Sequence, residues 1–246
     1  NEGPQKHSPA ELSRNYSKSP VFLTPPEIVF FMVGAIEALI SQNGRGISDR
    51  NQSRLHIVDP AVGTGNFPVG ILDRALQELF QTSRSFWNDW LPALSFSCID
   101  SQQTLLDQAQ VQVDLILEKL RNHTKDKRSS SRPKLSSNSK RKRLSHIQPH
   151  ILWLCRDTLE SAENTIEIHN KIEKFADQDI LVVIGNPPYA ISSNTKSAWI
   201  QSLVEDYKHA LNRPGKKKIV GLKGIQDDYV KFFRWGQWLL TQSASP

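Results

Sequence analysis

The residues best suited to chemistry form a run of four, Asn186-Pro187-Pro188-Tyr189, directly after the apolar stretch ILVVI. Proline cannot continue the hydrogen-bond ladder of a strand, and its fixed φ stiffens the exit from that strand. A stiff exit would hold the side-chain oxygen of Asn186 and the carbonyl oxygen of Pro187 as two acceptors at one point, with the Tyr189 ring beside them. Two acceptors and a stacking ring suit a planar base that carries an exocyclic NH₂ group. The alternative is a strand that ends in proline, followed by a tyrosine that only packs.

A second run, DPAVGTGNF at 59–67, carries Asp59, Ala61, Gly63 and Gly65. Glycine allows positive φ and lets a ligand approach the backbone, so the run predicts a binding turn between a strand and a helix. The dinucleotide fingerprint GxGxxG is broken because its third position is Pro68, and no GxxxxGK[ST] phosphate loop occurs in the sequence. A plain turn is the alternative.

Two further carboxylates, Asp100 and Asp157, each follow an apolar run. Asp100 could accept both hydroxyls of a ribose, and Asp157 could accept a hydrogen bond from an adenine amino group. Either residue could instead be a helix cap. The cysteines, Cys98 and Cys155, lie 57 residues apart without a CxxC motif. This spacing rules out a disulfide scaffold and disfavours a zinc cluster, so we expect no metal site.

These candidate residues all follow predicted strands in a chain where apolar runs alternate with helical patterns. The predicted strands cover 55–58, 96–99, 151–154 and 180–184, and the predicted helices begin near Pro25 and carry apolar faces over 69–79, 105–120 and 229–240. The predicted inward face of the first helix consists of Ile28, Met32, Ile36 and Leu39. The alternation predicts an α/β fold with a mostly parallel sheet and helices on both faces. The continuously apolar fourth run predicts a strand covered on both faces.

The composition separates one segment from the rest of the 246 residues, whose net charge is +6. Residues 121–143 hold ten Lys or Arg and a single acid, Asp126, so they contribute +9 and the remainder sums to −3. We therefore predict a disordered basic insertion at about 122–148, and a flexible tail over 1–20. The insertion is either a solvated loop or an arm that contacts phosphates.

The sequence also bears on location. The longest apolar run, 28–40, has 13 residues and contains Glu37, so it is too short and too polar to span a membrane. The chain begins with Asn, without a charged and then apolar signal segment. We expect a cytoplasmic protein and a fragment of a longer one.

With DPAVGTGNF, Asp100, Asp157 and NPPY in this order after the segment FLTPP at 22–26, the sequence resembles the N6-adenine DNA methyltransferases of the NPPY class. The stretch 185–240 is similar in particular to the methylase part of type ISP restriction-modification enzymes. The residues that carry this likeness are Trp199, Asp206-Tyr207-Lys208 and the run DDYVKF at 227–232. The resemblance covers roughly residues 21–241. It implies a Rossmann-like methyltransferase fold over 21–246, incomplete at its C-terminus.

The resemblance further implies S-adenosylmethionine as the methyl donor and an adenine in double-stranded DNA as the acceptor, without a metal. The residues that match the cofactor-binding positions of the family are Thr24, Pro25, Asp59, Ala61, Gly63, Gly65, Asp100 and Asp157. Those that match its catalytic motif are Asn186, Pro187, Pro188 and Tyr189. Val62 departs from the usual Cys, Thr or Ala, and Pro68 falls where a first helical turn tolerates proline. A missing C-terminal target-recognition segment, or a partner chain, is also expected.

Two alternatives stay open at this point. An adenine in RNA or a glutamine amide in a protein presents a similar pair of N–H donors, although the FLTPP and DDYVKF runs favour DNA. The chain could also be an inactive truncated remnant, or an interaction fragment, since only 57 residues follow Tyr189.

Overall fold

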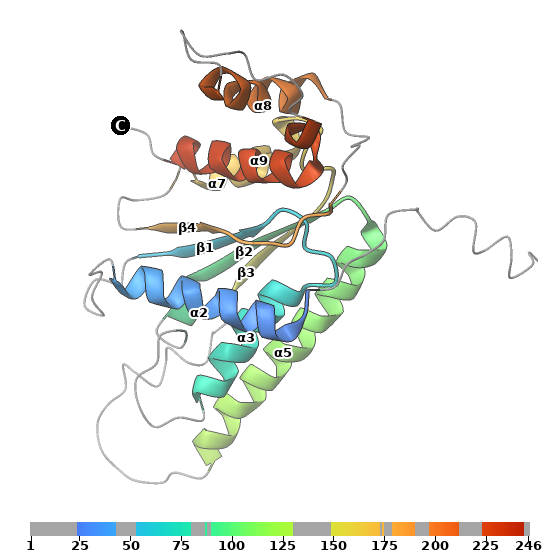
Figure 1. Cartoon of the computed structure of the whole chain (residues 1–246). Coiled ribbons are helices and arrows are strands. Elements are labelled where there is room, and N and C mark those ends of the chain that lie inside the picture. The colour runs from blue at the N-terminus through green and yellow to red at the C-terminus, as the bar shows by residue number, and fades with distance from the viewer. Residues whose placement is uncertain are drawn as a thin grey trace, which may run out of the picture.

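The computed structural model describes residues 24–42, 53–79, 87, 90–129, 149–172, 174, 179–189, 197–211 and 223–243 (Figure 1). The predicted tail at 1–20 and residues 130–148 of the predicted insertion lie outside this part of the chain. None of the described helices is long and apolar enough to cross a membrane.

Helices and strands alternate along the described chain, as the sequence predicts. In order they are α2 (Pro26–Gln42), β1 (Leu55–Asp59), α3 (Asn66–Leu79), β2 (Leu94–Asp100), α5 (Gln103–Ser129), β3 (His150–Cys155), α7 (Ile166–Ile172), β4 (Ile180–Val183), α8 (Ala198–Leu211) and α9 (Asp228–Ser243). All four predicted strands are confirmed, with ends that shift by one or two residues. The seven-residue helix α7 was not predicted, because so short a segment shows no clear period.

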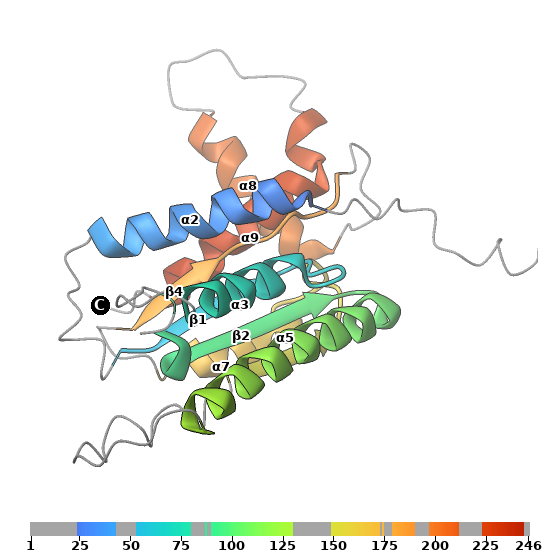
Figure 2. The ribbon, with the colours of Figure 1, turned by 90° about the horizontal axis from the view of Figure 1, so that it is seen from below.

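The four described strands form one parallel sheet in the order β3-β2-β1-β4. In the middle of the sheet, Leu55 of β1 lies opposite Leu94 of β2 on one side and Ile180 of β4 on the other. Helices α2, α3 and α5 cover one face, and α7, α8 and α9 cover the other (Figures 1 and 2). The order of the strands reverses between β1 and β4. This confirms the predicted Rossmann-like α/β fold and places its switch point, where such sheets bind ligands, beside the end of β1.

Each face of the sheet has its own hydrophobic core. Leu55 and Ile57 of β1 point into the core under α2, α3 and α5. Val58 points to the other side, into the core that contains Trp235 and Leu239 of α9. This alternation follows from the two-residue period of a strand, and it anchors helices to both faces.

Burial in α2 differs from the prediction, whereas burial in β4 agrees with it in part. The buried residues of α2 are Val29, Val33, Ile36 and Ile40, so the predicted face was wrong by about one residue. The reason is that α2 is apolar on several sides, and Ile28 and Leu39 are in fact 49% and 62% exposed. Strand β4 is covered on both faces as predicted, since Ile180 and Val182 pack against one core and Leu181 and Val183 against the other, but it is only half-buried because β1 is its only partner in the described sheet.

The long helix α5 enters the segment predicted as disordered. It begins at Gln103 and continues through residues 122–129 to Ser129. No proline or glycine interrupts this stretch, and Lys and Arg are good helix formers. The predicted start of the insertion at about 122 therefore has to move to the end of α5.

Candidate functional site

The candidate residues that follow the four strands lie at one edge of the sheet. In the parallel registers, Asp100 is opposite Cys155, so β2 and β3 end level, whereas Asp59 is opposite Cys98, so β1 ends two residues earlier. Beyond β4, the amide of Ile184 donates to the carbonyl of Val58 at 3.0 Å. The exit towards Asn186 therefore runs beside the end of β1.

The turn after β1 is shaped by two glycines in the left-handed region, with φ of 54° at Gly63 and 89° at Gly65. A Cβ atom at Gly65 would lie 3.0 Å from the Cα of Ala109, so this glycine lets α5 pack closely. A Cβ atom at Gly63 would meet no described atom within 4 Å. Gly63 therefore leaves its side of the turn open, as a ligand-binding position requires.

Asp100 fastens this turn to the end of β2. Its Oδ2 accepts the amide N–H of Gly63 at 3.0 Å, and its Oδ1 accepts that of Gln102 at 2.9 Å. Burial raises the pKa of Asp100, and the backbone N–H donors oppose that rise. Asp100 thus holds the chain just before α5, and its carboxylate oxygens keep lone pairs for further donors.

Asp59 lies deeper, with 2% of its surface exposed. Its Oδ1 accepts the amide of Ala61 at 3.2 Å, whereas its Oδ2 is buried with no hydrogen-bond partner among the described residues. Burial raises the pKa of Asp59 to about 8, against the hydrogen bond from Ala61, and the nearby charge of Asp100 adds to the rise. A Cβ atom at Gly185 would lie only 2.8 Å from Oδ1 of Asp59. Asp59 therefore touches both the glycine turn and the exit from β4.

The run after β4 presents Asn186 and Tyr189 at this edge. The hydroxyl of Tyr189 donates to Oδ1 of Asn186 at 3.1 Å, and Tyr189 is 58% exposed. Its ring stacks on that of Tyr229, with centroids 5.5 Å apart and planes inclined by 11°. Tyr229 was missed as a site residue, because only its place in the DDYVKF run marked it.

A cavity of about 220 Å³ lies between the exit from β4 and α9. It is lined mainly by apolar and aromatic residues, including Val183, Pro187, Tyr229 and Phe233. Of the residues of β4, only Val183 lines the cavity, so it lies at the end of that strand.

Asp157 reaches the same edge from β3 but acts mainly on its own loop. Its Oδ1 accepts the amide of Leu159 at 2.9 Å, which closes a turn and does not cap a helix, because the next helical element begins only at Glu163. The next residue, Thr158, donates its hydroxyl to the carbonyl of Pro60 at 2.6 Å. Thr158, which sequence reasoning missed, therefore ties the loop after β3 to the turn after β1.

The FLTPP segment also contacts the turn. The side-chain amide of Asn66, the first residue of α3, donates to the carbonyl of Thr24 at 3.0 Å. Thr24 is 9% exposed, and α2 begins two residues later at Pro26. The start of α2 is therefore held beside the glycine turn.

Two residues that carry the resemblance in α8, Asp206 and Tyr207, fasten this helix to α9. Arg234 donates to a carboxylate oxygen of Asp206 at 2.6 Å and to the carbonyl of Leu203 at 2.9 Å. The Tyr207 hydroxyl donates to the side chain of Gln237. These contacts stabilise the layer that carries Tyr229 without lining the edge of the sheet.

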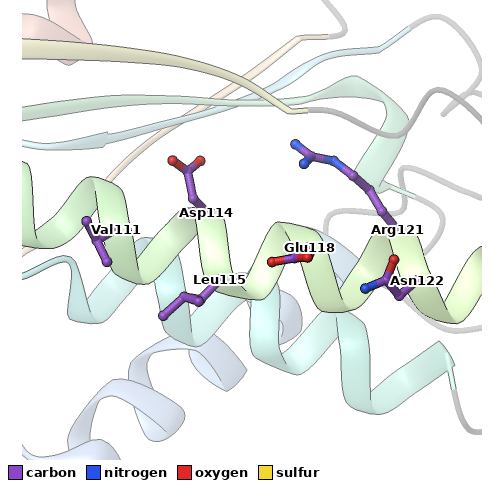
Figure 3. A pocket seen from close by; sticks show the side chains of 6 residues that line it. All are labelled: Val111, Asp114, Leu115, Glu118, Arg121 and Asn122. Atoms are coloured by element: carbon purple, nitrogen blue, oxygen red, sulfur yellow. The ribbon is translucent and has the colours of Figure 1, made fainter.

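A second cavity, of about 550 Å³, lies along the middle of α5 (Figure 3). The lining residues that the structure describes come from that helix: Val111, Asp114, Leu115, Glu118, Arg121 and Asn122. These residues carry charges of both signs and include no nucleophile, so they are poor candidates for chemistry. No group of three or more His, Cys, Asp or Glu residues in the described part of the chain is placed to hold a metal ion.

No protein-family model and no curated protein sequence matches the chain. Its fold matches solved structures, one of which is DrdV in complex with DNA. Two others are type ISP restriction-modification enzymes. They are a nuclease-deletion mutant of LlaGI in complex with a DNA substrate mimic, and the ATP-dependent enzyme LlaBIII bound to DNA. The TM-scores are 0.55, 0.59 and 0.60, and the sequence identities are 20%, 18% and 16%, over 94%, 93% and 94% of this chain. The chain spans 21%, 20% and 14% of the length of those chains. At such identities, the likeness establishes the fold.

Proposed function

We propose that the chain is the methyl-transferring part of a restriction-modification enzyme and acts on the N6 amine of an adenine in DNA, with S-adenosylmethionine as donor. The observation that carries the proposal is the contact between two runs at the switch point. The open turn at Gly63 leaves β1, the Asn186 run leaves β4, and Gly185 brings the second run against Asp59. A donor site and an acceptor site would therefore share one crevice.

The residues around the turn fit S-adenosylmethionine by their chemistry. Asp100 offers carboxylate lone pairs to a ribose diol, and the open side of Gly63 gives access to backbone groups. The unpartnered Oδ2 of Asp59 suits a cationic N–H donor, because a buried polar atom gains most from a partner. Thr24, Pro25, Ala61, Gly65 and Asp157 would complete this site. The bound cofactor would supply a methyl group on a positively charged sulfur.

The Asn186 run would act on the acceptor. An adenine amine is a poor nucleophile because its lone pair is delocalised into the ring. Oδ1 of Asn186 and the carbonyl of Pro187 would accept its two N–H groups and favour a tetrahedral nitrogen. The same oxygens would stabilise the positive charge that develops on nitrogen, and water would then take the proton. Pro188 keeps this segment stiff. In the free chain the Tyr189 hydroxyl holds Oδ1 of Asn186, so the incoming N–H group replaces it.

The target adenine has to leave the duplex to reach this crevice, and Tyr189 would stack on it. DNA as the substrate is supported by the structural neighbours, which were solved with DNA or a DNA mimic. We further propose that a C-terminal segment or a partner chain completes the sheet beside β4 and recognises the DNA sequence. The half-buried strand and the apolar cavity next to it support this, because an unpaired edge can accept another strand.

Transfer of a radiolabelled methyl group tests the proposal. The chain would be assayed together with the polypeptide that follows it in its reading frame, on DNA duplexes, RNA and a glutamine peptide. Label in N6-methyladenine of DNA is expected, and Asn186→Ala should abolish it. Label in RNA or in the peptide would support the alternative acceptors instead. An absence of label on all three substrates would support the inactive remnant.

A further inference from the structure

We infer that Tyr229 is a positioning residue for the target base: its ring backs Tyr189, so that the opposite face of Tyr189 receives the base. This inference rests on the proposed function. The inference gives Tyr229, in the first turn of α9, a role that the proposed chemistry of the Asn186 run does not require.

The geometry of the two rings leaves no place for a base between them. Their planes are nearly parallel, at 11°, and their centroids are 5.5 Å apart, which is an offset stack in direct contact. A third ring inserted between them would need about twice the stacking distance. A base can therefore stack only on the other face of Tyr189, which gives a stack of three rings.

Tyr229 is held more rigidly than the ring it supports. It lies in the first turn of α9, where its amide donates to Oδ1 of Asp227 at 2.9 Å. Two turns further on, α9 is anchored in the core by Trp235 and Leu239, which are fully buried. Tyr189, in contrast, lies in an irregular segment after β4, so the stack transfers the rigidity of a packed helix to it.

Both rings are exposed, as a site that binds a base requires. Tyr189 is 58% exposed and Tyr229 is 44% exposed, so the stack stands at the surface instead of filling a core. Loss of one aromatic stacking partner should weaken base binding roughly three- to tenfold. Loss of Tyr229 should leave cofactor binding unchanged, since its hydrogen bond and its ring contact reach Asp227 and Tyr189 and none of the residues assigned to the cofactor.

The experiment uses a single-stranded oligonucleotide with 2-aminopurine in place of the target adenine, titrated with the full chain. Stacking on Tyr189 quenches the fluorescence of the probe. The variants are Tyr229→Ala, Tyr229→Phe and, as a matched control, Phe31→Ala. Phe31 lies on α2, is 72% exposed and does not line the cavity beside Tyr229, so its removal deletes an exposed ring of similar size away from the site. Melting temperature and calorimetric binding of S-adenosylmethionine are measured for every variant.

The expected result is a roughly three- to tenfold weaker quenching titration for Tyr229→Ala only, with rescue in Tyr229→Phe and unchanged cofactor affinity. Equal affinity in Tyr229→Ala and the parent chain would overturn the inference. Tighter binding would also overturn it, because Tyr229 would then compete with the base. If the expected pattern appears but no methyl group is transferred to any acceptor, the base site stands and the proposed reaction falls. If the parent chain does not quench the probe at all, the inference fails.

Discussion

Replacement of Asp59 by asparagine should change the pH dependence of stability. Asp59 is 2% exposed, and burial raises its pKa from an ordinary value of 3.8 to about 8. The folded state therefore binds this proton more tightly than the unfolded state. Stability is then greatest below the unfolded pKa and falls as the pH rises from about 4 to about 8, where the folded carboxyl finally ionises. Asparagine has nearly the same shape and does not titrate.

The size of the effect follows from the shift. About four pKa units at roughly 1.36 kcal/mol each give up to about 5 kcal/mol across this pH range. Asp59→Asn should thus be close to the parent chain in free energy of unfolding near pH 4, and more stable by up to about 4 kcal/mol near pH 7. Asp100, whose pKa burial also raises, is present in both proteins, and its contribution largely cancels.

Urea unfolding at a series of pH values from 4.5 to 8.5 would measure this difference. Asp114→Asn, at an exposed position on α5, is the matched control for loss of a surface carboxylate. Its difference from the parent chain should stay flat across the series. If the curves for Asp59→Asn and the parent chain run parallel over the whole pH range, the argument from burial is wrong.

Four other outcomes are expected. Gly185→Ala should lower the free energy of unfolding by about 1–3 kcal/mol, because its Cβ atom would lie 2.8 Å from Oδ1 of Asp59. Gly34→Ala should raise the free energy of unfolding slightly, because a Cβ atom there meets open space; thermal melts compare the two variants. Asp100→Ala should weaken binding of S-adenosylmethionine roughly ten- to hundredfold, and unchanged affinity in calorimetry would remove Asp100 from the site. Asn186→Ala should abolish methyl transfer with cofactor affinity nearly intact, a prediction that near-parental radiolabel transfer contradicts. Residues 1–246 alone should not methylate DNA at a useful rate, because β4 has no second strand partner among the described residues and Phe233 is 60% exposed; efficient transfer by this chain alone would show that no further segment is needed.

The part of the site that could be predicted depends on local patterns. Apolar runs that end in Asp59, Asp100 and the Asn186 run mark the carboxyl ends of strands, and parallel pairing brings such ends to one edge. The contacts that could not be predicted join residues far apart in the sequence. The stack of Tyr189 on Tyr229 and the hydrogen bond from Thr158 to Pro60 depend on how loops meet in space, which no local period encodes.

Local patterns alone also could not show which face of α2 is buried, or how α8 and α9 contact each other. Several sides of α2 are apolar, so periodicity alone could not decide which one faces the sheet. The sequence displays the run Asp206-Tyr207-Lys208 in α8 and the run DDYVKF in α9, but only the structure pairs Asp206 with Arg234, two residues beyond the second run. This ion pair holds a layer of the fold together.

The length of α5 sets the distance between the edge of the sheet and the start of the basic insertion. The helix begins at Gln103, just after Asp100, and runs for 27 residues, which at 1.5 Å per residue is about 40 Å. Under the proposed function, the point at which the basic insertion joins α5 therefore lies about 40 Å along that helix from the edge where the target adenine would bind. Base pairs recur about every 3.4 Å, so if the insertion is the arm that contacts phosphates, this separation corresponds to about 12 base pairs of duplex. Deletion of residues 130–148 should then shorten a nuclease footprint by about one helical turn on one side only, with the base pairs next to the adenine still protected.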